Sequence, residues 1–344
     1  MASLRGESAA PILALTQGDP AGIGPEITLR AWMERDARGL PPFAVLSDPA
    51  FLRDIAAGLG WRVPIEAVTI EDAAGVFADA LPVLRLEAPV SAVPGRPDPA
   101  TATTTIGSID RAVALVREGA ATAVVTNPIA KHVLYSAGFT HPGHTEFLAA
   151  LAAAPGKAAP RPVMMLWSEE FAVVPVTVHI PLRDVPEALT ADLLVETARI
   201  VAHDLRVRFG IPAPRIAVAG LNPHAGENAT IGQEDREVVA PAVARLQGEG
   251  HDVSGPFPAD TLFHARARRN YDAALAMYHD QALIPIKTIA FDEAVNVTLG
   301  LPFVRTSPDH GTAFDIAGQG IARPDSLSAA LRLAARLASS APPA

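Results

Sequence analysis

The stretch "RIAVAGLNPHAGE" (residues 215–227) carries the pattern that decides the fold. It is a short run of small and β-branched apolar residues that ends in a turn with Gly and Pro, which is typical of a buried strand followed by a loop. The same pattern occurs in "FAVVPVTVHIPLRD" (171–184) and "YDAALAMYHDQALIPIK" (271–287). Each run leads to a histidine, and these are His179, His224 and His279.

Strand-like and helical segments alternate along the rest of the chain. Residues 11–16, 43–48 and 122–126 are further apolar runs, and the sequence predicts helices near 186–209 and 234–249. Strands separated by helices imply βαβ units in a mainly parallel sheet with helices on its faces. The expected fold class is therefore α/β.

Length and composition restrict the class of protein. With 344 residues the chain is longer than one typical domain, so we expect two domains. Hydrophobic residues make up 49% and charged residues 19%, which is enough for large buried cores. The net charge is −9 and no basic block occurs, which argues against nucleic acid as a partner.

The absence of cysteine limits both the chemistry and the compartment. It excludes disulfides, thiolate metal sites, iron–sulfur clusters and a cysteine nucleophile, and it suits a reducing cytosol. The N-terminal stretch lacks a secretory apolar region. No segment approaches the roughly 20 apolar residues that cross a bilayer. We therefore expect a soluble, cytoplasmic protein that does not bind a membrane.

The three histidines are candidate metal ligands. In parallel α/β sheets, ligands bind at the carboxyl ends of the strands, and neutral imidazole is the commonest side-chain ligand for zinc and similar ions. His179, His224 and His279 could together form a three-histidine centre with one position open for substrate. The alternative is that each is a buried, hydrogen-bonded structural histidine.

Two glycine-containing loops are further candidates. "GDPAGIGPE" (18–26) could cradle an anion at a helix N-terminus, or it could be a tight structural turn. It is not a P-loop, and Ile27 stands where the dinucleotide fingerprint has its third glycine. In "GHTEFL" (143–148), His144 and Thr145 could bind substrate, or Thr145 could cap a helix.

Polar residues also follow apolar runs in the C-terminal third. Lys287, Asn296 and Arg305 would match a small, doubly anionic ligand, because Arg offers a bidentate fork for phosphate or carboxylate. Lys287 could instead snorkel from a strand end. Asp260 and Asp280 could orient a metal-ligating imidazole.

Taken together, these motifs resemble the 4-hydroxythreonine-4-phosphate dehydrogenase family over nearly the whole chain, from about Ala14 to Arg323. The family is related to isocitrate and isopropylmalate dehydrogenases, which share a "GIGPE"-like loop and a loop like that at 310–324. The resemblance is carried, in the family's order, by "GDPAGIGPEI", "TNPIAK", "GHTEFL", "VHIPLRD", "LNPHAGE", "GPFPADTLF", "AMYHDQALIPIK" and "VNVTLGLPFVRTSPDHGTAFDIAG".

The resemblance implies an architecture of two α/β/α lobes with the active site in a central cleft. We expect one lobe, with both glycine-rich loops, at residues 1–135 plus 300–344. The other lobe, at 136–299, would carry the metal, the substrate residues and the surface for homodimerisation.

The resemblance also assigns roles to individual residues. It implies that His279 reaches the metal of the partner subunit in a homodimer, and that Lys287 also takes part in catalysis. The implied metal ligands are His179, His224 and His279; the implied substrate ligands are His144, Thr145, Lys287, Asn296 and Arg305; the implied cofactor residues are Gly311 and Asp315.

The implied reaction is oxidation of 4-phosphohydroxy-L-threonine by NAD or NADP, followed by decarboxylation to 3-amino-2-oxopropyl phosphate in vitamin B6 biosynthesis. A divalent ion (zinc, magnesium or cobalt) would assist by polarising the reacting oxygen. "GDP" at 18–20 departs from the "GEP" more usual in the family and occurs in relatives acting on four-carbon sugar-acid phosphates. D-Threonate or D-erythronate 4-phosphate is therefore an alternative substrate. A three-histidine hydrolase or aldolase and a non-catalytic phosphate-binding module are alternatives from other classes.

Overall fold

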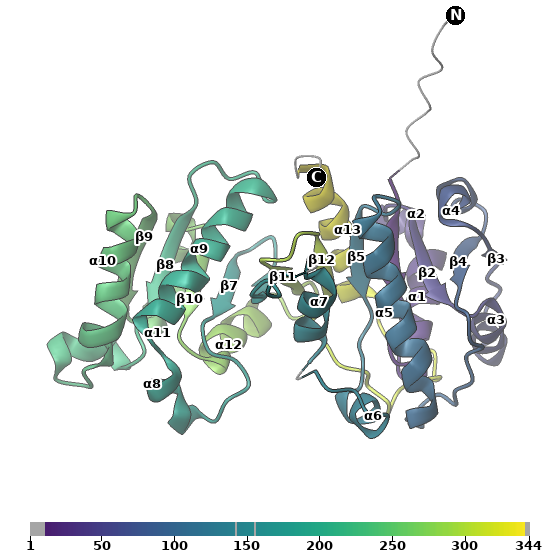
Figure 1. Cartoon of the computed structure of the whole chain (residues 1–344), viewed down its shortest axis with the longest axis horizontal. Coiled ribbons are helices and arrows are strands. Elements are labelled where there is room, and N and C mark those ends of the chain that lie inside the picture. Colours follow the sequence, from purple (N-terminus) through teal and green to yellow (C-terminus); the bar gives the residue numbers. More distant parts are fainter. Residues whose placement is uncertain (1–10, 142, 155, 341–344) are drawn as a thin grey trace, which may run out of the picture. The chain divides into compact units, whose positions relative to one another are not determined.

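The computed structural model describes residues 11–141, 143–154 and 156–340, and the chain divides into two compact units (Figure 1). Unit 1 comprises residues 1–160 and 302–338, and unit 2 comprises 161–301 and 339–344.

The division differs from the expected lobes, whose boundaries lay after residues 135 and 299. Residues 136–160 belong to unit 1 because α7 (His144–Ala152) packs on α5 (Ala102–Arg117). Arg117 Nη1 donates a hydrogen bond to the carbonyl oxygen of Leu151 over 2.8 Å. The segment is thus part of the same unit as the helix on which it packs.

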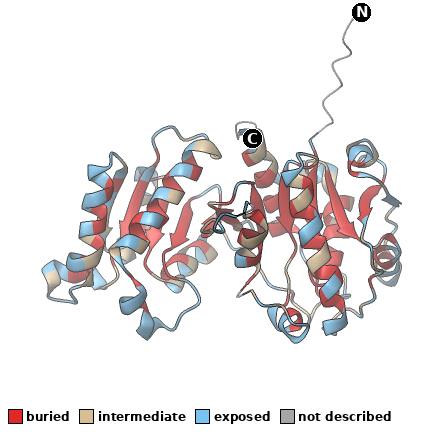
Figure 2. Ribbon diagram, viewed as in Figure 1, coloured by how far each residue is buried: buried red, intermediate tan, exposed pale blue. Residues whose placement is uncertain are grey.

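The sheet of unit 1 is parallel, with the order β3-β4-β2-β1-β5-β12. Its central strands are runs of Leu, Val and Ala whose side chains are buried, and Figure 2 shows these strands as the core of the unit. The strands are β1 (Leu13–Thr16), β2 (Phe43–Ser47), β3 (Ile65–Ala67), β4 (Leu81–Arg85), β5 (Ala123–Thr126) and β12 (Arg305–Pro308).

Helices cover this sheet, as the alternating pattern predicted. α5 packs on β1, β2 and β5, and α4 packs on β2 and β4. Their bounds, with the remaining helices of the unit, are α1 (Gly24–Met33), α2 (Arg35–Arg38), α3 (Pro49–Gly58), α4 (Ile70–Val76), η1 (Pro99–Thr101), α5 (Ala102–Arg117), α6 (Lys131–Ser136), α7 (His144–Ala152) and α13 (Asp325–Ser340).

The sheet of unit 2 has the order β11-β6-β7-β10-β8-β9. β6 is antiparallel to both of its neighbours, and the pairs from β7 to β9 are parallel. The predicted α/β fold is confirmed in both units. The strands are β6 (Val163–Trp167), β7 (Ala172–Pro175), β8 (Arg215–Ala219), β9 (Asp252–Phe257), β10 (Ala273–Ala276) and β11 (Val295–Leu299).

The helices of unit 2 differ in detail from the prediction. Lys287 lies in the last turn of α12, so the interpretation of its segment as a strand end is wrong. Among the described residues, no helix is both long and apolar enough to cross a membrane. The helical segments are η2 (Leu182–Asp184), α8 (Val185–Ala188), α9 (Ala191–Val207), η3 (Pro223–Ala229), the π-helical η4 (Asp235–Val239), α10 (Ala240–Gly248), α11 (Ala259–Leu262), η5 (Ala267–Asn270) and α12 (His279–Ile289).

Candidate active site

The three candidate histidines follow three neighbouring parallel strands of unit 2. The strands lie in the order β7-β10-β8, and their carboxyl ends lead to His179, His279 and His224, respectively. His179 and His224 are exposed and His279 is half-buried, so none of them is the buried structural histidine that was the alternative interpretation. This edge of the sheet is where parallel α/β proteins bind ligands.

His179 and His279 lie side by side. Their ring centroids are 5.4 Å apart, and both line a hollow of about 240 Å³ together with Asp280. Asp280 Oδ1 is 2.7 Å from His279 Nδ1. A carboxylate that accepts from one ring nitrogen leaves the lone pair of the other nitrogen available, which is the usual arrangement of a metal-ligating histidine.

His224 lies in a loop of unusual backbone conformation. Its φ is 54°, and φ remains positive through residues 225–229. The left-handed conformation costs roughly 1–2 kcal/mol for each residue with a Cβ. Other contacts must therefore hold this loop in its left-handed conformation. The sequence pattern does not predict these contacts.

Polar side chains join the three strand ends to one another. Gln281 Oε1 accepts from the Met277 backbone N–H over 2.6 Å, and Gln281 Nε2 donates to the Gly220 carbonyl over 2.8 Å. The Thr177 hydroxyl donates to the Met277 carbonyl over 2.7 Å. These contacts connect β10 with β8 and with β7, so they fix the segments that carry the histidines.

The donor types fit a divalent ion of zinc type, because imidazole is a common zinc ligand and the Asp280 carboxylate supports the His279 ring. Within the described part of this single chain, however, no group of three His, Cys, Asp or Glu side chains converges on one point. The histidines of one chain therefore do not by themselves complete a three-ligand centre.

A second candidate site lies at the start of α7 in unit 1. The N-cap residue is Gly143, which has no side chain to accept from the first N–H groups, and His144 and Thr145 begin the helix. The interpretation of Thr145 as the cap is therefore wrong. An uncapped helix N-terminus offers unpaired N–H groups and a positive dipole end to an anion.

A buried cation accompanies this helix end. Arg305 begins β12, and its Nε and Nη2 donate to the Thr126 hydroxyl over 3.2 and 2.6 Å. Burial lowers the pKa of Arg305 to about 10, so the guanidinium remains charged at neutral pH.

His144 adds a neutral imidazole. Burial, and then the positive charges of Arg305 and Lys131, hold the pKa of His144 well below its ordinary value. His144 Nε2 is buried without a hydrogen-bond partner. Lys131, in the motif "TNPIAK", is a nearby cation to which the sequence interpretation gave no role. These groups suit a phosphate or carboxylate.

The two remaining expected substrate residues belong to unit 2, whereas His144, Thr145 and Arg305 belong to unit 1. Lys287 is half-buried on α12. Asn296 lies on β11, and its Oδ1 is buried without a hydrogen-bond partner, as expected of a group that meets a ligand.

The loop at 18–26 supports the loop at 310–324. The Ile23 N–H donates to the Thr312 carbonyl over 2.9 Å, and a Cβ at Gly22 would lie only 2.9 Å from the same oxygen. The tight-turn interpretation thus explains Gly22, because only glycine allows this approach. Gly311 and Asp315 are exposed on the supported loop.

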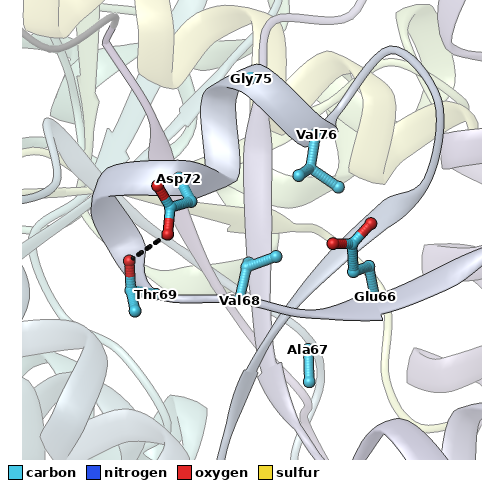
Figure 3. Close-up of a pocket in the computed structure, with 7 residues that line it drawn as sticks. All are labelled: Glu66, Ala67, Val68, Thr69, Asp72, Gly75 and Val76. Atoms are coloured by element: carbon cyan, nitrogen blue, oxygen red, sulfur yellow. Dashed lines mark hydrogen bonds between the residues drawn. The ribbon is translucent and has the colours of Figure 1, made fainter.

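A larger hollow in unit 1 has no comparable chemistry. It has a volume of about 570 Å³ and lies over β3 and α4, where Figure 3 shows its lining residues. Its carboxylates are those of Glu66 and Asp72, and the Thr69 hydroxyl donates to Asp72 over 3.1 Å at the start of the helix. Without a cation or an imidazole, this hollow does not suit the anionic ligand considered above.

Candidate site residues beyond the carboxyl ends of parallel strands are typical of an α/β enzyme. The family model of the pyridoxal phosphate biosynthetic protein PdxA matches residues 40–334. A relative from Methylorubrum populi, named 4-hydroxythreonine-4-phosphate dehydrogenase, is 67% identical over 95% of this chain and 94% of its own length. The chain therefore belongs to the PdxA family and is a dehydrogenase.

Solved structures agree with this assignment. The 4-hydroxythreonine-4-phosphate dehydrogenase from Klebsiella pneumoniae aligns with a TM-score of 0.82 at 39% identity, over 96% of this chain and 99% of that one. A terephthalate 1,2-cis-dihydrodiol dehydrogenase from Burkholderia xenovorans aligns with a TM-score of 0.63 at 28% identity, over 95% and 98%. Membership in a dehydrogenase family implies a nicotinamide cofactor.

Proposed function

We propose that this chain oxidises 4-phosphohydroxy-L-threonine with NAD or NADP, with subsequent loss of CO2 to give 3-amino-2-oxopropyl phosphate. The reaction belongs to vitamin B6 biosynthesis, the role of the PdxA family, and we place it in the cytoplasm. The observation that carries the choice of a phosphorylated substrate is the uncapped start of α7 beside the buried Arg305.

The anion site of unit 1 would hold the phosphate. Arg305 supplies a charge that the Thr126 hydroxyl has already oriented, and His144 supplies a neutral imidazole that can donate through Nε2. Thr145 lies in the first turn, where its backbone N–H has no acceptor within the helix. Such charge-assisted contacts are about twice as strong as neutral hydrogen bonds.

In unit 2, His179 and His224 would hold a divalent ion together with His279 of the partner subunit in a homodimer. The ion would polarise the oxygen of the reacting carbon, which favours both oxidation and decarboxylation. Imidazole donors favour zinc over magnesium.

Other residues complete the proposed assignment. Gly311 and Asp315, on the loop that the 18–26 segment supports, would bind the nicotinamide nucleotide, and a Cβ at Gly311 would meet no neighbour within 4 Å. Lys287 would stabilise negative charge or transfer a proton, and Asn296 would accept from a substrate donor through Oδ1.

A substrate panel tests this proposal. The protein is incubated with NAD or NADP and, separately, with 4-phosphohydroxy-L-threonine, D-threonate 4-phosphate and D-erythronate 4-phosphate, and the reduced-nicotinamide absorbance is followed. We expect the highest kcat/KM with 4-phosphohydroxy-L-threonine. A preference for either sugar-acid phosphate would assign the chain to the alternative substrate. No reduction of either nucleotide with any of the three would contradict the dehydrogenase reaction and favour a hydrolase or aldolase.

A further inference from the structure

We propose that Asp235 is a positioning residue for His224, because its buried carboxylate holds the loop at 220–229 in the conformation that presents the imidazole to a metal ion. This inference rests on the proposed metal site. Asp235 itself would not touch the ion, the substrate or the cofactor.

The Asp235 carboxylate is the anchor of the loop. It is 2% exposed and lies at the start of η4, well after the loop in sequence. Its Oδ1 accepts from the Leu221 backbone N–H over 2.7 Å. Its Oδ2 accepts from the backbone N–H and from the side-chain Nδ2 of Asn222, both over 3.0 Å. The carboxylate thus binds the two residues immediately after Gly220, where the chain leaves β8.

Two glycines make room for this carboxylate. A Cβ on Gly220 would lie 2.9 Å from Asp235 Oδ1 and 2.7 Å from the Ala225 Cα. A Cβ on Gly226 would lie 3.2 Å from Asp235 Oδ2, and Gly226 has a φ of +77°. The loop therefore wraps closely around the Asp235 side chain, and His224 lies between the two glycines.

The conformation of His224 depends on this anchor. His224 begins the run of positive φ values only two residues after Asn222, and that run is unfavourable for side chains with a Cβ. If the carboxylate is removed, the N–H groups of Leu221 and Asn222 lose their acceptor. The residues with positive φ values are then no longer held in that conformation. The imidazole would then have to be ordered by the ion itself, which weakens metal binding.

A neighbouring carboxylate provides a matched control. Glu234 Oε2 accepts from the Asn222 side chain over 2.9 Å, and Glu234 is half-buried. It has the same charge and nearly the same position in sequence, but it does not bind the backbone of the loop. Asp235→Asn and Glu234→Gln therefore separate the anchoring of the backbone from a general effect of negative charge.

The test measures zinc and cobalt affinity of the metal-stripped, full-length protein by isothermal titration calorimetry, at a temperature where circular dichroism shows every variant to be folded. We expect Asp235→Asn to raise Kd by about 10- to 100-fold, and Glu234→Gln to leave it nearly unchanged. The cobalt absorption spectrum of Asp235→Asn should also change, because the geometry of the ligand field changes. A folded Asp235→Asn protein with the wild-type Kd and spectrum would overturn the proposal.

A milder variant keeps the test decisive if Asp235→Asn does not fold. Asn222→Ala removes one of the three hydrogen bonds to Asp235 and keeps both backbone contacts, so we expect a smaller rise in Kd; an unchanged Kd and cobalt spectrum would count against the anchor. His224→Ala distinguishes failure of the metal site from failure of the Asp235 anchor. If wild-type and His224→Ala proteins bind metal equally, the proposed metal site fails; if only His224→Ala loses binding, the site stands and Asp235 alone is in question.

Discussion

Arg305 donates from Nε and Nη2 to the hydroxyl of Thr126, and the two residues lie on the neighbouring parallel strands β12 and β5. The hydroxyl fixes the plane of a buried guanidinium before any ligand arrives. An anion that binds there meets a donor already oriented, which reduces the loss of side-chain entropy on binding.

Replacement of Thr126 by Val should therefore weaken substrate binding. Hydrogen bonds to charged groups are worth about 1.5–3 kcal/mol, so we expect KM for the phosphorylated substrate to rise about 10-fold or more with a smaller change in kcat. Steady-state kinetics measure both. Thr122→Val, at the other end of the same strand run, is the control, since the Thr122 hydroxyl donates only to the Ile12 carbonyl in the described contacts. Equal kinetics for the two variants would refute the orienting role.

Folding stability should depend on pH through His144. The pKa of His144 is lowered well below 6.5 in the folded protein, so below that pH the unfolded chain binds a proton that the folded chain does not. The contribution of His144 to the free energy of unfolding should therefore be fully present above about pH 6.5. It should fall on acidification, with a slope of at most about 1.4 kcal/mol per pH unit.

Urea unfolding between about pH 7 and pH 5 measures this slope. His144→Gln should flatten it, whereas His203→Gln, an exposed substitution on α9, should not. An identical slope for wild type and His144→Gln would show that the imidazole is not buried in its neutral form.

The loop at 310–324 should depend on Glu26. The Glu26 carboxylate is 1% exposed and accepts from the backbone N–H groups of Gly318 and Ala322, both over 2.9 Å. Glu26→Gln replaces one acceptor oxygen with a donor that opposes these N–H groups. We expect KM for the nicotinamide nucleotide to rise several-fold while KM for the phosphorylated substrate stays constant. Glu34→Gln, which removes only partly exposed ion pairs with Arg30 and Arg38, is the comparison. Equal shifts in both KM values would contradict a role specific to the proposed cofactor loop.

Close packing at Gly18 should make it intolerant of a side chain. Its φ is +74°, and a Cβ would lie 2.7 Å from both the Asn127 Cβ and the Pro128 carbonyl oxygen. Gly39 has a φ of +57° but no neighbour within 4 Å. Gly39→Ala should cost about 1 kcal/mol from the left-handed backbone alone, and Gly18→Ala about 1–3 kcal/mol more from overlap. Chemical denaturation measures the difference, and equal losses would show that the loop relaxes freely.

The alternation of strands and helices could be predicted because its signal lies within each segment. Apolar runs such as 11–16 and 122–126 directly indicate strands. Two local interpretations were wrong for identifiable reasons. "LIPIK" has the composition of a strand, yet packing of α12 on β7 and β10 makes Lys287 helical despite Pro285 inside the helix. Thr145 resembles a cap, but the extended Gly143 takes that position.

The supporting contacts of the site could not be predicted from local patterns. Glu26 and Gly318 are 292 positions apart in sequence, and Gln281 and Gly220 are 61 apart. Asp235 looks like any acidic residue at the start of a helix. Only the fold brings these side chains to the backbone groups that they hold, whereas the histidines themselves stand directly after recognisable strands.

Removal of metal tests the central claim most directly. The protein is stripped with a chelator, shown by circular dichroism to remain folded, and assayed with 4-phosphohydroxy-L-threonine and NAD or NADP before and after addition of zinc, cobalt or magnesium. We expect no reduced nicotinamide from the stripped protein, recovery on addition of a divalent ion, and no recovery for His224→Ala. Full turnover by the stripped protein, or full recovery by His224→Ala, would contradict this claim.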